Sequence, residues 1–96
     1  MRPCYVYILS NRRYGVLYVG FTNELARRIF EHKSRATPGF ASEYGATRLV
    51  YVEEFPTALE ARNRERSLKR WRRVWKPKLI DDFNPAWRDL AEDIAA

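Results

Sequence analysis

The chain has 96 residues, enough for one domain with a single hydrophobic core and too few for two such cores. Its hydrophobic fraction of 46% excludes a disordered chain, and its single cysteine, Cys4, excludes an internal disulfide and a cysteine-based zinc site. The net charge of +6 favours an anionic partner. The N-terminal apolar run is interrupted by Pro3 and no stretch is long enough to span a membrane, so we expect a cytoplasmic protein with Cys4 as a small buried strand residue.

The first expected elements are two strands, residues 5–9 and 16–20, which form an antiparallel hairpin around a polar turn rich in Asn, Arg and Gly. Alternation assigns the first strand to two faces, with Tyr5, Tyr7 and Leu9 on one face and Cys4, Val6 and Ile8 on the other. Tyr18 shares its face with Gly20, whose missing side chain we expect to leave open space beside Tyr18. Ordinary packing would by itself explain both strand tyrosines.

A helix that carries Arg27, Arg28 and His32 is expected next, with Thr22 or Asn23 as its cap. Its apolar stripe consists of Leu25, Ala26, Ile29 and Phe30. At about 100° per residue, Arg28 and His32 lie one turn apart on one flank of the stripe, beside the sheet, and Arg27 lies on the opposite flank. A solvated arginine and a structural histidine are the common alternatives, but their position directly after a tyrosine strand favours a site.

Residues 34–47 have the composition of a loop, and residues 49–52 form a third strand that ends over residues 53–55. Thr57 and Glu60 have the spacing of a capping box and open the next helix. Glu65 falls inside the narrow apolar seam of that helix, where a carboxylate is costly unless a cation or hydrogen-bond donors meet it. Glu65 is therefore either a metal ligand or the partner of a neighbouring arginine.

Half of the 18 Lys and Arg residues lie between Arg62 and Lys78, and two tryptophans, Trp71 and Trp75, lie among them. A solvated helix face is the usual explanation of such a run. With tryptophans that can stack on bases, the run also predicts a nucleic-acid-binding surface, whose residues are Lys69, Arg70, Arg72, Arg73 and Lys76. Core packing of both tryptophans is the alternative.

Beyond Arg70 the helix is expected to break, and a further helix runs to about residue 82 with Pro77 in its first turn. Asn84 and Pro85 predict the start of a last helix over residues 85–94. Its inward stripe is Trp87, Leu90, Ala91 and Ile94, and its outward acids are Asp89, Glu92 and Asp93. The expected architecture is α+β, a small three-stranded, mostly antiparallel sheet flanked by helices, in one domain over residues 1–96 with its core at about 4–82.

These residues resemble the GIY-YIG endonucleases, whose two name-giving motifs lie on adjacent strands of a small sheet. Residues 5–7 stand at the first motif and residues 18–20 at the second. Arg28 stands where the family places a helix arginine, ten positions after the second tyrosine, and His32 where some members carry a histidine or tyrosine. The resemblance is greatest to the small single-domain bacterial branch and extends to about Ile94. It also places a single metal-binding glutamate on the helix of Glu65.

The resemblance implies a metal-dependent endonuclease that hydrolyses phosphodiester bonds in DNA, with structural or weak sequence selectivity, and a role in DNA repair or recombination. The implied catalytic residues are Tyr7, Tyr18, Arg28, His32 and Glu65, and Glu65 would hold one Mg²⁺ or Mn²⁺. The two tyrosines would jointly orient and deprotonate water, helped by the metal's water shell or by His32. Branched DNA, single-stranded DNA and RNA stay open as substrates, as do a monomer and a weak homodimer. The alternatives are a noncatalytic nucleic-acid-binding module and a protein-interaction scaffold.

Overall fold

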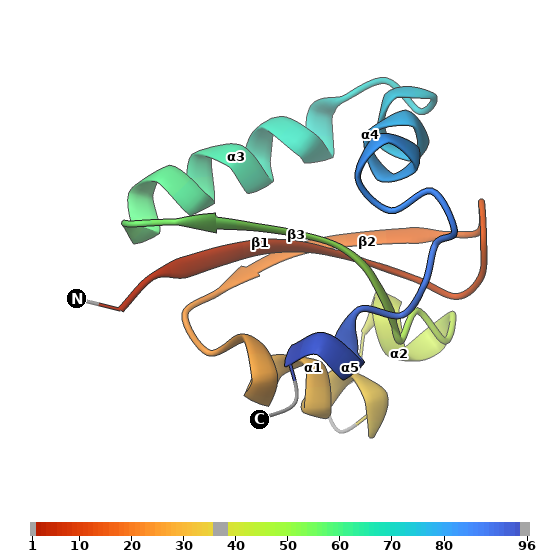
Figure 1. Ribbon diagram of the computed structural model, residues 1–96, viewed down its shortest axis with the longest axis horizontal. Coiled ribbons are helices and arrows are strands. Elements are labelled where there is room, and N and C mark those ends of the chain that lie inside the picture. Colours follow the sequence, from red (N-terminus) through yellow and green to blue (C-terminus); the bar gives the residue numbers. More distant parts are fainter. Residues whose placement is uncertain (1, 36–38, 95–96) are drawn as a thin grey trace.

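A three-stranded antiparallel sheet lies between two layers of helices (Figure 1). The computed structural model describes residues 2–35 and 39–94. The elements are β1 (Cys4–Ser10), β2 (Leu17–Thr22), α1 (Leu25–Lys33), α2 (Phe40–Glu43), β3 (Arg48–Phe55), α3 (Ala58–Arg70), α4 (Trp75–Phe83) and α5 (Ala91–Ile94). The strand order is β2-β1-β3, and both pairings are antiparallel. The expected α+β architecture is confirmed. No helix in the described ranges is long and apolar enough to cross a bilayer.

The central strand β1 sends its side chains alternately into two hydrophobic clusters, as its sequence predicts. Cys4, Val6 and Ile8 pack under α3 and α4 with Ala61, Leu68 and Ile80. Tyr7 and Leu9 pack on the opposite face with Leu25 and Ile29 of α1. In Figure 1, α3 and α4 lie above the sheet, whereas α1, α2 and α5 lie below it. Tyr7 therefore reaches the layer that contains α1.

Helix α3 begins and ends where the sequence predicts. The Thr57 side chain accepts a hydrogen bond from the Glu60 backbone N–H, which satisfies one of the free donors at the helix start. The helix ends at Arg70 because Trp71 adopts an extended backbone with ψ of 149°. In α4, Pro77 lies in the first turn, where no intrahelical partner needs its missing N–H.

Two local expectations about loops and caps are wrong. The N-cap residue of α1 is Glu24, and no side chain makes a capping hydrogen bond there. Thr22 Oγ1 instead accepts a hydrogen bond from the backbone N–H of Glu24, before the first turn of the helix. The segment expected to be a loop contains the short helix α2, in which Ala41 is buried, and Ala46 is buried shortly after the helix ends. Small alanines can pack closely under the sheet, so this segment adds to the core on the α1 side.

The predicted helix over residues 85–94 is also wrong, because only Ala91–Ile94 is helical. Asn84 is buried, and its side-chain amide donates hydrogen bonds to the backbone carbonyls of Val50 and Arg88. Trp87 has a φ of 53° and is fully buried in the cluster under α3 and α4. These bonds hold residues 84–90 in a non-helical course, in place of the predicted cap and first turns.

The same segment passes the free edge of β3 and continues to the other face of the sheet. The Leu90 backbone N–H donates to the Leu49 carbonyl at 2.7 Å, and the Leu49 N–H donates to Asp89. Asp89 also pairs with Lys33, so it does not face outward as predicted, whereas Glu92 and Asp93 are exposed. Beyond this edge, Leu90, Ala91 and Ile94 pack on the α1 side.

Candidate active site

Three aromatic side chains meet on the α1 side of the sheet. Tyr7 lies in the middle of β1, Tyr18 lies near the start of β2, and His32 lies in the last turn of α1. The ring centroids are 6.4 Å apart for Tyr7 and Tyr18, 5.8 Å for Tyr7 and His32, and 5.4 Å for Tyr18 and His32. A hydrogen bond of 3.1 Å joins Tyr7 Oη and His32 Nε2. Tyr7 is fully buried, His32 is nearly so, and Tyr18 is half-buried.

The space beside Gly20 is not open, contrary to the sequence-based expectation. Gly20 is paired with Tyr7 across the sheet, and the Tyr7 phenol lies over it. A Cβ at this position would lie 2.5 Å from Tyr7 Oη and 3.2 Å from Tyr18 Cε2. Gly20 is therefore what allows the Tyr7 hydroxyl to lie beside His32.

Arg28 lies one turn before His32 on α1, and it faces the same aromatic cluster. Its guanidinium lies close enough to Tyr7 that its positive charge and its hydrogen-bonding groups lower the pKa of the phenol. Its side chain is 44% exposed, and its Nε is 3.4 Å from a carboxylate oxygen of Glu31. The neighbouring Arg27 is 70% exposed and pairs with Glu24 and Glu31 instead. Of these two adjacent arginines, Arg28 is the one whose charge acts on Tyr7.

Burial sets the protonation of the Tyr7–His32 pair. It raises the pKa of Tyr7 above the usual 10.0, and the charge of Tyr18 raises it further, whereas Arg28 lowers it. Burial lowers the pKa of His32 below its usual 6.5, and the charge of Arg28 lowers it further, whereas Glu31 raises it. At neutral pH both side chains are therefore uncharged, and a neutral imidazole can accept the hydrogen bond of the Tyr7 hydroxyl.

Glu65 comes to this region from the other layer of helices. It lies on α3, which packs across β1 and β2, and its side chain is only 13% exposed. Its charge is among the causes that raise the pKa of Tyr7, after burial and the charge of Tyr18. The ion-pair partner of Glu65 is not an arginine but Lys69, at 3.1 Å and one turn along the helix. Since Lys69 is half-exposed, breaking its ion pair with the Glu65 carboxylate costs little free energy.

The donor set of Glu65 fits a hard divalent cation that keeps most of its water. A carboxylate oxygen is the ligand type that Mg²⁺ and Mn²⁺ prefer. Within residues 2–35 and 39–94, no group of three or more His, Cys, Asp or Glu side chains could enclose a metal ion. A cation at Glu65 would therefore be held by fewer than three such side chains and would keep several waters, as Mg²⁺ tolerates.

The predicted nucleic-acid-binding residues lie around the turn from α3 to α4. Lys69, Arg70, Arg72 and Arg73 are exposed and Lys76 is half-buried; we call these five residues the basic surface. The two tryptophans differ. Trp71 is half-buried against the core cluster, whereas Trp75 is 47% exposed. Core packing therefore accounts for Trp71 and not for Trp75.

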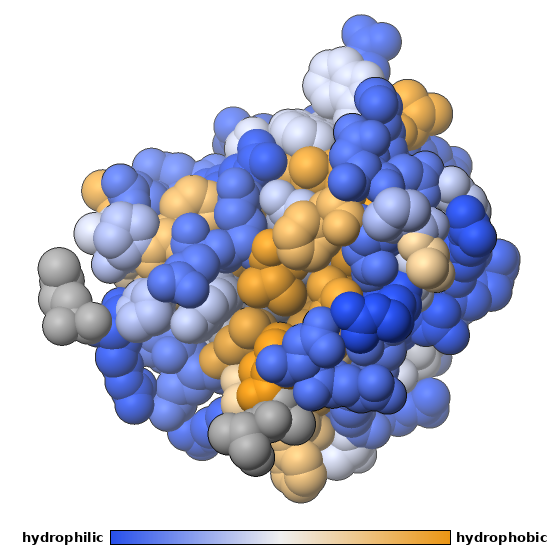
Figure 2. Space-filling view, in the orientation of Figure 1, coloured by the Kyte–Doolittle hydropathy of each residue, from blue (hydrophilic) through white to orange (hydrophobic). Residues whose placement is uncertain are grey.

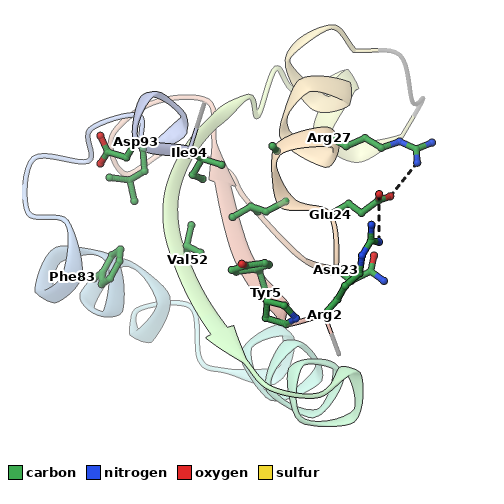
Figure 3. Close-up of a pocket in the computed structure, with 13 residues that line it drawn as sticks. Arg2, Tyr5, Asn23, Glu24, Arg27, Val52, Phe83, Asp93 and Ile94 are labelled. Carbon is green, nitrogen blue, oxygen red and sulfur yellow. Dashed lines mark hydrogen bonds and ion pairs between the residues drawn. The ribbon is translucent and has the colours of Figure 1, made fainter. Parts of the chain in front are cut away.

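A large apolar groove lies apart from the five predicted catalytic residues. It has a volume of about 720 Å³ and lies between the start of β1, the start of α1, β3 and α5 (Figure 3), with Tyr5, Val52 and Ile94 in its lining. Arg2 and Arg27 pair with Glu24 along one rim. Figure 2 shows the apolar band to which the groove belongs, on the face seen in Figure 1. None of the five predicted catalytic residues lines the groove, whose apolar floor does not suit a phosphodiester.

Comparison with known proteins identifies the family. The model of the GIY-YIG catalytic domain matches residues 3–78. The chain belongs to the GIY-YIG family. The range matched by the model of this nuclease family contains all five predicted catalytic residues.

Several relatives of the GIY-YIG chain carry the family name UPF0213. One, from Clostridium perfringens, is 38% identical over 76 residues, which cover 79% of this chain and 81% of the relative. Another, from Staphylococcus haemolyticus, is 35% identical over 86 residues, which cover 85% of this chain and 99% of the relative. The solution NMR structure of a UPF0213 protein from Bacillus halodurans has 35% identity and a TM-score of 0.52, over 82% of this chain and 83% of that chain.

Sequence reasoning missed two contributors to the GIY-YIG site. Gly20 was expected to leave space, and its contact with Tyr7 could be found only from the pairing register of β1 and β2. Glu31 pairs with both Arg27 and Arg28, and its spacing from them on α1 would have indicated this. Glu31 therefore helps to fix the guanidinium of Arg28 beside the tyrosines.

Proposed function

We propose that this GIY-YIG protein is a metal-dependent endonuclease that hydrolyses phosphodiester bonds in DNA, with structural or weak sequence selectivity. The observation that carries the proposal is the convergence of Tyr7, His32 and Arg28 on one side of the sheet, with the charge of Glu65 acting on the same tyrosine. A binding module needs no buried tyrosine–histidine pair beside a half-exposed arginine. Hydrolysis needs groups that orient water and stabilise charge, and these residues supply them.

Arg28 stabilises the negative charge that gathers on the phosphoryl oxygens in the transition state. Its planar guanidinium offers several donors in a fork that matches two phosphate oxygens. Because its side chain is 44% exposed, a phosphate can reach it, and its pairing with Glu31 limits its orientations before substrate binds.

Tyr7 and Tyr18 together position the attacking water, and Tyr18 is the one of the two that takes its proton. Tyr18 is the half-buried member and contacts the water, whereas the fully buried Tyr7 holds Tyr18 and His32 in place through its ring and hydroxyl. The raised pKa of Tyr7 keeps its proton on the phenol near neutral pH. Tyr7 thus donates a hydrogen bond, and the neutral His32 accepts it.

Glu65 would hold one Mg²⁺ or Mn²⁺ through its carboxylate. Such an ion, when bound, supplies Lewis-acid stabilisation of the leaving group and acidifies its own water. Lys69 would then release the Glu65 carboxylate, and with the rest of the basic surface it would contact the DNA backbone. The protein would act as a monomer or a weak homodimer. Its substrate is duplex, branched or single-stranded DNA, or RNA, and the test below compares them.

The second candidate function is a noncatalytic nucleic-acid-binding module, favoured by the existing ion pair of Glu65 with Lys69. In that case Glu65 needs no metal, and the basic surface carries the whole function. The two candidates differ in what the loss of the Glu65 charge does to cleavage and to binding.

The test is cleavage of labelled duplex, flap, fork and single-stranded DNA, and of RNA, with Mg²⁺ or Mn²⁺. Wild type is compared with Glu65→Gln and with Glu60→Gln, which removes an exposed carboxylate from the same helix. We expect wild type and Glu60→Gln to cut and Glu65→Gln to bind without cutting. Cleavage by Glu65→Gln would refute its role as the metal ligand, and salt-sensitive binding without cleavage by any variant would establish the binding module.

A further inference from the structure

A second cleft lies at the turn between α3 and α4, outside the proposed catalytic residues. Trp71 and Trp75 meet edge to face, with ring centroids 6.0 Å apart and an interplanar angle of 84°. Beside them is a cavity of about 340 Å³, which we call the tryptophan cleft; its lining is Trp71, Trp75, Lys78, Leu79 and Asp82. Its volume lies within the range of about 300–1,000 Å³ that small-ligand sites occupy.

The lining combines flat apolar walls with a polar mouth. Trp75 is 47% exposed although tryptophan burial is strongly favourable, while Leu79 packs against the core and closes the inner end. Lys78 and Asp82 are exposed and pair at 3.4 Å, so they offer donors and acceptors at the opening. A ligand that is flat and aromatic on its faces and polar at its edge fits such a lining, and nucleobases have this chemistry.

The cleft carries an acidic side chain, whereas the chain around it is strongly basic. From Ser67 to Leu79 the sequence has six lysines and arginines and no acid. The Arg72 guanidinium lies 5.7 Å from the Trp75 ring centroid, where it can also meet a phosphate. The carboxylate at the mouth of the cleft belongs to Asp82, which would repel a phosphate and accept a hydrogen bond from a base amino group. A nucleotide would therefore bind with its base in the cleft and its phosphate on the basic surface.

We propose that the tryptophan cleft binds one unpaired nucleobase of the nucleic acid, stacked on Trp75. In a duplex the faces of a base are covered by its neighbours, so only a base outside the stack can enter. The inference rests on the proposed function and names its substrate class: DNA with a single-stranded segment or branch beside the cut. Glu65 precedes the end of α3 by five residues, about 7–8 Å along the axis, so the captured base lies within a few nucleotides of the reacting phosphate.

The test measures binding by fluorescence anisotropy in EDTA, where no metal-dependent cleavage occurs. The probes are a short blunt duplex, the same duplex with a single-stranded extension, and that duplex with an abasic extension that keeps the phosphates. Trp75→Ala and Trp75→Phe are compared with wild type and with Val74→Ala, a matched change at an adjacent, exposed apolar residue. Denaturation curves check that each variant is folded.

We expect wild type to bind the extension about tenfold more tightly than either the blunt or the abasic duplex, as stacking of one base supplies. Trp75→Ala should lose this preference and keep its affinity for the blunt duplex, with the same salt dependence. Trp75→Phe should retain part of the preference and Val74→Ala all of it. Equal binding of normal and abasic extensions by wild type would overturn the inference without any variant.

The outcomes separate this inference from the proposed endonuclease. A base preference lost in Trp75→Ala, in a protein that cuts no substrate, would support the cleft and refute the nuclease. Cleavage by wild type with unchanged base preference in Trp75→Ala would refute the cleft and support the nuclease.

Discussion

Gly20→Ala is the substitution whose effect follows most directly from the geometry. The added Cβ would lie 2.5 Å from Tyr7 Oη and 2.6 Å from Tyr7 Cζ, whereas ordinary contact begins near 3.4 Å. The phenol must therefore move by about 0.9 Å, because the alternative is a shift of the β2 backbone. Tyr7 is fully buried, so its neighbours must move with it.

The displacement has a cost in stability and a larger cost in rate. Overpacking of a buried position typically costs about 1–3 kcal/mol, and each kcal/mol lowers Tm by about 4–8 °C in a domain of this size. A displacement of about 0.9 Å exceeds the range of about 0.5 Å over which such hydrogen bonds form, so in either direction it would break or strain the 3.1 Å bond between Tyr7 Oη and His32 Nε2. Misplacement by about 1 Å can lower the rate about 100-fold, so we expect that loss in kcat.

The assay is a double-mutant cycle with Tyr7→Phe, measured by kcat and by urea denaturation. Since Tyr7→Phe already lacks the hydroxyl, adding Gly20→Ala should cost stability again but little further activity. Additive losses in kcat would mean that Gly20→Ala acts through another group. Wild-type stability and kcat in Gly20→Ala would refute the placement of the Tyr7 phenol over Gly20.

Three further predictions use other parts of the structure. Arg28→Ala should lower kcat about 100-fold or more with little change in DNA affinity, because it removes a hydrogen-bond donor to the transition state. The control Arg27→Ala should leave kcat nearly unchanged. Equal losses in kcat and affinity would make Arg28 a binding residue. The pKa of His32 is lower in the folded protein than its value of about 6.5 in the unfolded chain. Below pH 6.5 the unfolded chain therefore binds a proton that the folded protein does not, and the free energy of unfolding should fall as pH decreases from about 7 towards the lowered pKa. Urea denaturation across that window should show this slope in wild type and not in His32→Gln; an unchanged slope would contradict the assignment. Asp89→Ala should lose about 1 kcal/mol in the same assay because it removes an acceptor from a backbone N–H of β3, whereas the exposed Asp93→Ala should leave the midpoint nearly unchanged.

Much of the site could be predicted because it depends on short-range periodicity. The alternation of β1 puts Tyr7 on the face that meets α1, and the helical period puts Arg28 and His32 on the flank beside it. The position of Glu65 in the seam of α3 correctly predicted a mostly buried carboxylate. Each of these inferences requires only the period of one element. Their catalytic roles stay predictions.

The errors concern contacts between distant parts of the chain. Asn84 followed by Pro85 is a strong local signal for a helix start, but the buried carbonyl of Val50 takes the Asn84 amide instead. The buried Trp87 was predicted to face inward, yet it does so from a left-handed backbone position that no helical pattern contains. Likewise, Asp89 looked like a solvated acid until Lys33 and the β3 edge were placed beside it.

The passage of residues 84–90 along the free edge of β3 determines where this protein can be shortened. Residues 84–90 occupy hydrogen-bonding groups of β3 that would otherwise be free to pair with a strand of another molecule, which is how exposed edges lead to aggregation. The range matched by the family model ends at residue 78, before Ile80 and Trp87, two of the largest fully buried side chains. A fragment cut at residue 78 would lack both side chains and expose the edge of β3. We therefore expect the unit that folds to extend beyond the unit that the family shares.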